Sequence, residues 1–302
     1  MAQQVDSLKS IFYALGANGA IAVAKLAAAA FTGSSAMLAE GIHSLADCGN
    51  QGLLLWGVKA AKKPPTPDYP LGFGKAIYFW SFIVALILFT MGGMFSIYEG
   101  LHKLDHPEPM SAPWVAVLVL LFAIVAESFS LWGCLKEVVK IQGDRNLWEW
   151  FRESRQSELL VVFGEDIAAL LGLFVALMSV GMTIITGDPI YDAQGSIVIG
   201  VLLILVAIMI GVEVKALLIG QSAEPAVVGS LRAFLEERPE VERVFNLLTL
   251  QLGDDLMVAV KAKMMPCESP REMIEAVNRC EVAMKAAFPQ VLWSFFEPDI
   301  RD

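Results

Sequence analysis

Six long apolar stretches constrain this chain more than any other feature of its sequence. They span residues 11–31, 35–60, 76–101, 112–135, 159–185 and 190–219. Each is long enough to cross a bilayer, whose hydrocarbon core takes about 20 apolar residues per helix. The runs lack the period-two alternation of a membrane barrel, and backbone groups in lipid must be bonded within their own segment. The sequence therefore predicts an α-helical membrane protein with six transmembrane helices.

Composition and charge exclude several classes of protein. Charged residues make up 18% and hydrophobic residues 56% of the chain, whereas soluble domains carry roughly 25% charged residues. A net charge of −10 argues against a nucleic-acid partner, because phosphate binding needs clustered Lys and Arg. The four cysteines include no CxxC pair, so neither a disulfide framework nor a thiolate zinc site is expected. No cofactor is expected.

Basic residues in the links between stretches indicate the orientation. They lie after the second and fourth stretches, whereas the other links carry almost none, Lys103 being the exception. By the positive-inside rule both termini face the cytoplasm, which agrees with an even number of spans. We expect residues 1–10 to be a short cytoplasmic lead, residues 11–221 to form the membrane domain, and the membrane to be a bacterial-type inner membrane.

Residues 222–302 have an ordinary charge density and predict a small cytoplasmic domain. The expected elements are a helix at 225–237, strands at 241–252 and 256–265, a helix at 269–288 and a strand at 291–298. Ser269 is a plausible N-cap with Pro270 at the first helical position. This α-β-β-α-β order predicts a ferredoxin-like α+β sandwich with its helices on one face of the sheet. Because a domain of about 80 residues is near the lower limit for a lone core, we expect it to pair with a second copy.

The second stretch carries ionisable residues at Glu40, His43 and Asp47. His43 and Asp47 are four residues apart and share one helical face. Ionisable groups at membrane depth are costly and usually mark an ion path or a proton relay. An imidazole and a carboxylate together suit a borderline cation such as Zn²⁺. The structural alternative is a His–Asp hydrogen bond that fixes this helix to a neighbour.

The fifth stretch adds a second pair of acids, Glu165 and Asp166. Adjacent residues point about 100° apart on a helix, so we expect Asp166 to be the inward group; alternatively both acids lie at the membrane interface. His43, Asp47 and Asp166 then supply three ligands, whereas tetrahedral zinc takes four. The fourth is Glu165, Glu40 or a water, and the sequence does not choose among them.

A resemblance to a known family rests on these residues. The segment GxxAxxAEGxHSxxD at 33–47, six spans and a small α+β tail resemble the cation diffusion facilitator family over essentially the whole chain. The resemblance implies a homodimeric, alternating-access exporter of zinc or a similar cation, driven by protons. It also implies a site of two ligands four apart on the second span and two on the fifth.

The match to that site is incomplete. His43, Asp47 and Asp166 agree with it, but Val162 stands where many members have His. With Gly-Glu-Asp at 164–166, this departure resembles the zinc transporter nine branch. In the link at 68–76, Tyr69 and Phe73 stand where metal-binding histidines commonly occur in the family. The tail contains no His. A metal site in that loop and metal sensing by the tail are therefore not expected.

Other polar residues in the apolar stretches have two interpretations each. Glu127 either contributes to a proton path or bonds a neighbouring helix. His102 and His106 are expected in a non-cytoplasmic link, solvated or loading metal weakly. Asp188 and Asp192 either attract cations at the exit or act as turn and cap residues. Contacts between helices are expected for Asn18, Lys25, Asn50 and Gln51.

The function that the sequence favours is Zn²⁺/H⁺ antiport, in which metal binding displaces protons from the ligands. Manganese or iron transport by the same fold is an alternative, because carboxylates suit those metals. A metal-dependent intramembrane hydrolase is a third hypothesis, but HExxH and GxSxG motifs are absent. A membrane scaffold that only binds metal is the fourth. We expect a transporter, not an enzyme, with a divalent metal ion, protons, the lipid bilayer and a second copy as partners.

Overall fold

The computed structural model describes residues 18–301. They divide into two compact units, which are described separately here. The first unit contains residues 18–56, 80–144 and 158–213, and it holds most of the helix bundle. The second contains residues 57–79, 145–157 and 214–301, including the whole of the C-terminal tail.

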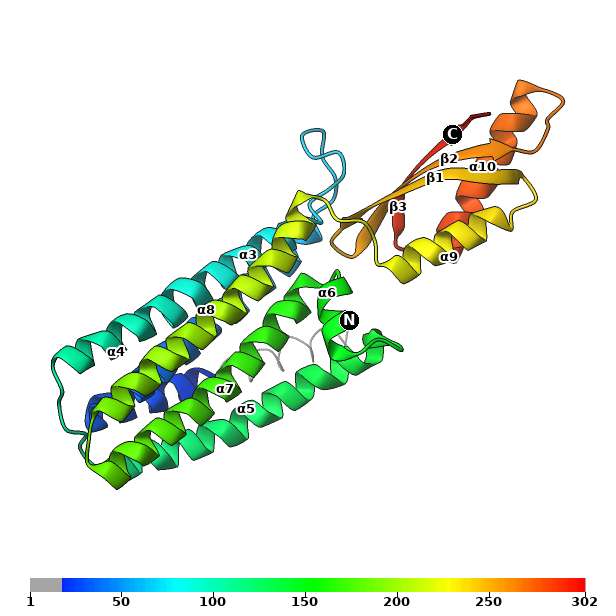
Figure 1. Ribbon diagram of the computed structural model, residues 1–302. Coiled ribbons are helices and arrows are strands. Elements are labelled where there is room, and N and C mark those ends of the chain that lie inside the picture. The colour runs from blue at the N-terminus through cyan, green and yellow to red at the C-terminus, as the bar shows by residue number, and fades with distance from the viewer. Residues whose placement is uncertain (1–17, 302) are drawn as a thin grey trace, which may run out of the picture. The chain divides into compact units, whose positions relative to one another are not determined.

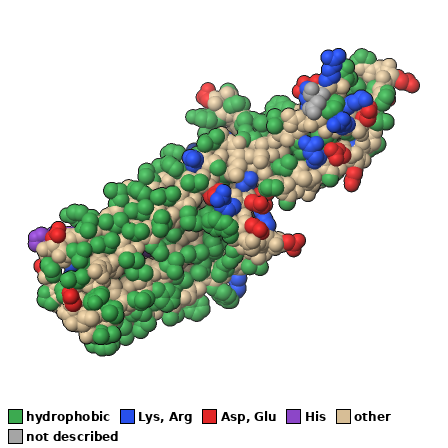
Figure 2. Space-filling view, viewed as in Figure 1, with side chains coloured by type: hydrophobic (Ala, Val, Ile, Leu, Met, Phe, Trp, Pro, Cys, Tyr) green, Lys and Arg blue, Asp and Glu red, His purple; other side chains and the backbone are tan. Residues whose placement is uncertain are grey.

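Six long helices form the bundle within the described residues (Figure 1). They are Asn18–Thr32, α2 (Ser35–Ala61), a continuous helix built from α3 (Ala76–Ile87), η1 (Leu88–Met94) and α4 (Phe95–Asp105), α5 (Pro113–Gln142), α7 (Ser157–Thr186) and α8 (Ile190–Ile219). Four of these, Ala76–Asp105, α5, α7 and α8, are long and apolar enough to cross a membrane by length and composition. Figure 2 shows hydrophobic side chains covering the visible face of the bundle. The predicted helical membrane fold is confirmed.

The third apolar stretch differs from a plain α-helix. Its central segment, η1, is a π-helix with the sequence LFTMGGM, a rare conformation that is found frequently at functional sites. The Thr90 hydroxyl donates to the carbonyl of Leu86 (2.9 Å) beside it. The helix also continues to Asp105, so His102 lies in its last turn; the expectation of a link there is wrong, because polar residues can extend a helix beyond its apolar run.

Glycines allow α8 to approach the third helix closely. A Cβ added at Gly200 would lie 2.6 Å from the carbonyl oxygen of Gly93, and one at Gly100 would lie 2.7 Å from that of Ala193. Backbones therefore meet at this interface, which is typical of membrane helices that pack through small residues.

The second unit contains a short helix that was not predicted from the sequence. Helix α6 (Leu147–Glu153) opens with a capping box in which Asn146 and Glu149 bond each other's backbone N–H groups. It has seven residues and Trp150 is fully buried. So short a helix shows too few turns for its periodicity to be recognised.

The tail folds as predicted, in α-β-β-α-β order. Its elements are α9 (Pro225–Glu236), β1 (Val241–Leu252), β2 (Asp255–Met264), α10 (Pro270–Ala287) and β3 (Val291–Pro298). In the sheet, β2 is central, antiparallel to β1 and parallel to β3. Alternate residues of β2 are buried, so one face of the sheet carries the core shared with α9 and α10. The predicted cap at Ser269 is confirmed, since its hydroxyl accepts from the Glu272 N–H (3.2 Å).

A charged cluster joins the start of β1 to α10. Glu240 accepts hydrogen bonds from Arg238 (3.2 Å) and from Arg279 (3.1 Å). Partial desolvation opposes ionisation of the Glu240 carboxyl. Hydrogen bonds from its own backbone N–H and from the two guanidinium groups outweigh this effect and lower its pKa below 4.5. The contribution of Glu240 to stability is therefore present above pH 4.5 and is lost in stronger acid.

Candidate metal site in the helix bundle

One face of α2 presents His43 and Asp47 to the interior of the bundle. The His43 side chain is fully buried, and its Nδ1 lies 3.4 Å from Asp47 Oδ1. Neither ring nitrogen has a hydrogen-bond partner among residues 18–301. The π-helix packs nearby, because a Cβ at Gly92 would lie 3.9 Å from His43 Nδ1. A buried imidazole without a bonding partner is unusual, and the alternative of a His–Asp hydrogen bond that fixes α2 to a neighbour does not account for it.

A small polar cavity adjoins Asp47. Its volume is about 20 Å³, enough for about one water molecule. Four carboxylates surround it, from three helices: Asp47 of α2, Glu127 of α5, and Glu165 and Asp166 of α7. The remaining lining residues are Asn18, Ser44, Gln51, Val162 and Ala169. Carboxylates concentrated around a space of this size are suited to holding a single cation.

Both acids of α7 line the cavity, whereas we expected Asp166 to be the inward group and Glu165 to be one candidate for the fourth ligand. Glu165 accepts a hydrogen bond from Asn50 of α2 (2.6 Å), and Asp166 accepts from Ser130 of α5 (3.2 Å). The 100° between neighbouring positions separates their bonding partners, but the cavity lies between α2, α5 and α7 and touches both side chains. The contact between helices predicted for Asn50 is confirmed.

Glu40 belongs to a different cluster. Lys25 of the first helix donates to Glu40 Oε2 (3.2 Å) and to the Ser44 hydroxyl (2.7 Å), and both charged side chains are fully buried. Glu40 Oε1 lies against α7, since a Cβ added at Gly172 would collide with it. The predicted contact of Lys25 between helices is confirmed. Charged residues inside membrane helices pair with one another or with backbone carbonyls, but the sequence alone did not identify Glu40 as the partner of Lys25.

The four residues expected to bind metal are only partly brought together. Asp47, Glu165 and Asp166 line the cavity, with Glu127 as a fourth acid, whereas His43 is beside Asp47 and outside the lining. Within residues 18–301 no three His, Cys, Asp or Glu side chains are arranged as a ready metal-binding group. A ligand shell therefore needs small side-chain movements around Asp47.

Polar residues at the opposite end of these helices have other surroundings. The rings of His102 and His106 stack with their centroids 5.1 Å apart and line a larger cavity of about 420 Å³. Asp188 lies just before α8 and caps it by accepting from the Ile190 N–H (2.9 Å). Its interpretation as a cap residue is therefore confirmed. Asp192 is instead fully buried and bonds to α2.

A multi-pass helical bundle that buries carboxylates from three helices around one small cavity defines a membrane protein built to handle cations. The sequence agrees, because residues 11–219 match the cation efflux transmembrane domain. The chain belongs to the cation efflux family.

Individual relatives are similar over most of this chain. It is 35% identical over 248 residues, 81% of its length, to the "Proton-coupled zinc antiporter SLC30A9, mitochondrial" of Mus musculus and to that of Homo sapiens. It is 30% identical over 222 residues, 73% of its length, to "Metal tolerance protein C4" of Arabidopsis thaliana. The matched region covers 44% of each of the two antiporters and 49% of the plant protein, so the chain spans less than half of their length.

Proposed function

We propose that this chain is a secondary active transporter that exports Zn²⁺ in exchange for protons by alternating access. The observation that carries the proposal is the cavity between α2, α5 and α7, which places Asp47, Glu165 and Asp166 around one cation-sized space. Membership of the cation efflux family supports transport over hydrolysis. The relatives named as proton-coupled zinc antiporters favour zinc over manganese or iron.

Asp47 is the central ligand in this proposal. Its carboxylate lines the cavity and also lies 3.4 Å from His43 Nδ1, so a cation bound to Asp47 is within reach of the imidazole after a small rotation. Asp166 and Glu165 complete the set from α7. Because carboxylates and imidazole bind metal in their deprotonated forms, occupation by Zn²⁺ releases protons. Protons that return to the same groups displace the metal, which couples the two fluxes.

Glu127 acts in this site as an additional carboxylate. It lines the cavity from α5, as Val162 does from α7. The apolar side chain of Val162 supplies no ligand, so the acid on α5 compensates for it. Glu40 is assigned to the ion pair with Lys25 and not to the cargo.

The oligomeric state and the orientation in the membrane are also part of this proposal. We propose a homodimer that pairs through the tail, with both termini on the cytoplasmic side of a bacterial-type inner membrane. The small size of the tail core and the basic links support this arrangement. The antiporters of Mus musculus and Homo sapiens are named as mitochondrial.

The experiment is zinc flux into sealed proteoliposomes with an imposed pH gradient. Wild-type protein is compared with Asp47→Ala and with Glu137→Ala, a matched control whose carboxylate is exposed and bonded to Lys140 on α5. We expect gradient-dependent flux in the wild type and the control, and none in Asp47→Ala. Flux that persists in Asp47→Ala would exclude this site, and manganese or iron flux without zinc flux would exclude the proposed cargo.

A further inference from the structure

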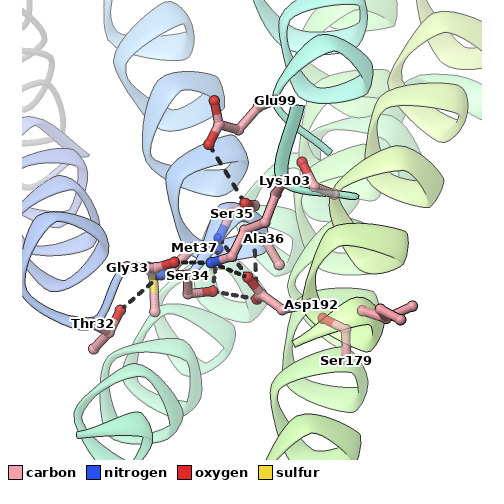
Figure 3. A network of polar contacts seen from close by, with 12 residues as sticks. Thr32, Gly33, Ser34, Ser35, Ala36, Met37, Glu99, Lys103, Ser179 and Asp192 are labelled. Atoms are coloured by element: carbon pink, nitrogen blue, oxygen red, sulfur yellow. Dashed lines mark hydrogen bonds and ion pairs between the residues drawn. The ribbon is translucent and has the colours of Figure 1, made fainter. Parts of the chain in front are cut away.

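A buried carboxylate on α8 holds the beginning of α2. Asp192, in the first turn of α8, accepts from the Ser34 hydroxyl (2.5 Å) and from the backbone N–H groups of Ser35 (2.6 Å) and Ala36 (3.4 Å), as Figure 3 shows. The first N–H groups of a helix have no partner within it and carry partial positive charge. Asp192 therefore caps α2 from a different helix.

A buried lysine on α4 completes this contact. Lys103 Nζ lies 3.3 Å from Asp192 Oδ2 and also donates to the carbonyl of Gly33, in the turn after the first helix (Figure 3). Lys103 binds the Gly33 carbonyl and Asp192 binds the first N–H groups of α2, so the two charged side chains hold both sides of the turn between the first helix and α2. We call Gly33, Ser34, Ser35, Lys103 and Asp192 the hairpin lock. The connection between α4 and α5 also contacts this turn, since the Ser111 N–H donates to the carbonyl of Thr32 (2.7 Å).

The larger cavity adjoins the hairpin lock. Ser34 and Lys103 belong to the lining of this space of about 420 Å³, together with the acids Glu99 and Glu108. Several water molecules fit a polar cavity of this size. Lys103 can therefore exchange its partners in the lock for water and carboxylates in the cavity without entering lipid. Asp192, at 0% exposure, has no such route unless α2 moves away from α8.

These contacts couple the lock to the metal site through α2. Ser35 and His43 are eight residues apart on the same helix, or about 12 Å along its axis. We propose that the Asp192–Lys103 pair keeps this end of the bundle closed, and that it must separate before the site at His43 and Asp47 can open toward this end. Asp192 is then a positioning residue for transport. The inference rests on the proposed function, because a transport cycle is what requires the end to open.

The pair suits a switch with two discrete positions. Two buried charges satisfied by each other and by backbone groups are stable when together, and each is strongly unfavourable when its partner is removed within a dry interior. Separation therefore has to coincide with water entry and with movement of α2, so partly opened arrangements are disfavoured. The lock thereby opposes simultaneous access from both ends, which would let ions leak.

The test measures exposure of α2 without measuring transport. Met37, fully buried next to the lock, is replaced by Cys in a chain whose four native cysteines have been replaced by Ser. The purified protein, in lipid nanodiscs without zinc, is reacted with a membrane-impermeant maleimide. We expect slow labelling in this parent and labelling at least about tenfold faster with Asp192→Asn or Lys103→Met. The matched control is Asp188→Asn, a partly exposed cap in the connection before α8, which should label like the parent.

A second reporter separates opening from general loosening. Ile210→Cys, in place of Met37→Cys, is also fully buried on α8 but lies toward the other end of that helix, and it should stay slow in every variant. The proposal is overturned if Asp192→Asn and Lys103→Met label Met37→Cys no faster than Asp188→Asn, or if Ile210→Cys becomes equally reactive. If Asp192→Asn does not fold, Lys103→Met, which leaves the cap intact, decides the result. Asp47→Ala is expected to abolish flux and does not touch the lock, so it should leave labelling unchanged, and the lock and the transport site fail or stand independently.

Discussion

Buried ionisable side chains in this bundle are of two kinds. Lys25 and Glu40 neutralise each other in a fully buried pair. His43 and Asp47 lie on the same face of α2, yet the imidazole has no hydrogen-bond partner and Asp47 Oδ1 has none either among the described residues. A paired charge stabilises a structure only while both partners remain, whereas a group without a partner is available for a ligand. The ion pair with Lys25 sets Glu40 apart from the proposed cargo ligands Asp47, Glu165 and Asp166, which form no ion pair with a Lys or Arg among the described residues.

The structural kind gives a stability prediction. Lys25→Met should destabilise the protein by about 3–5 kcal/mol, because it leaves the Glu40 carboxylate buried without compensation. The double variant Lys25→Met/Glu40→Gln should recover most of this loss, since no charge is then stranded. Thermal unfolding in detergent measures both. Equal losses in the single and double variants would show that the pair is not what holds these helices.

The cargo kind gives a binding prediction. Glu127→Gln should weaken zinc binding by about tenfold or more in a calorimetric titration, because it removes one of the four acids around the cavity. Adding Val162→His should restore affinity, since position 162 is one turn from Asp166 on the same face of α7. The control is Glu137→Gln, an exposed acid on α5, the helix that carries Glu127. Unchanged affinity in Glu127→Gln would remove that residue from the site.

At the scale of elements, the sequence predicts what depends on a single segment. Apolar runs determined α2, α7 and α8 to within two residues of their observed ends, because a membrane helix must satisfy its own backbone. The π-helix and the Asp192 cap were not predictable in this way. Both depend on which face one helix turns toward another, and hydropathy carries no signal for that rotation. The same limit explains why the sequence did not choose among Glu165, Glu40 and a water as the fourth ligand.

Packing between elements gives a matched pair of substitutions on α8. Gly200→Ala should cost about 1–3 kcal/mol, because its Cβ would lie 2.6 Å from the Gly93 carbonyl oxygen and 2.8 Å from the Ile97 nitrogen. Gly211→Ala meets nothing within 4 Å and should be neutral or stabilise by up to about 1 kcal/mol, since Ala favours a helix. Melting temperatures in detergent compare the two. The opposite order would contradict close backbone packing of α8 on the third helix.

For the molecule as a whole, the arrangement of charged links predicts its orientation. Basic residues cluster after the second and fourth stretches, and by the positive-inside rule we expect the tail to face the cytoplasm. The α+β order of the tail followed from its own alternation of polar and apolar residues. Its pairing with a second copy remains a prediction, as do the domain boundaries at residues 11, 221 and 222.

Orientation is testable in intact cells. Cys267 is partly exposed in the tail and should resist a membrane-impermeant thiol reagent until the cells are opened. A cysteine introduced as His106→Cys, in a chain without native cysteines, should react in intact cells, because position 106 follows the third span and is exposed. Labelling of Cys267 from outside would reverse the proposed orientation.

The size of the cavity between α2, α5 and α7 sets a condition on any ion that enters it. A space of about 20 Å³ has no room for a cation together with its hydration shell. The carboxylates must take over the role of that shell, and an ion enters only as fast as it sheds water. Mg²⁺ dehydrates reluctantly, so it is disfavoured kinetically even where its charge is right and its concentration is high. Discrimination among divalent ions thus begins with desolvation, before any preference among ligands applies.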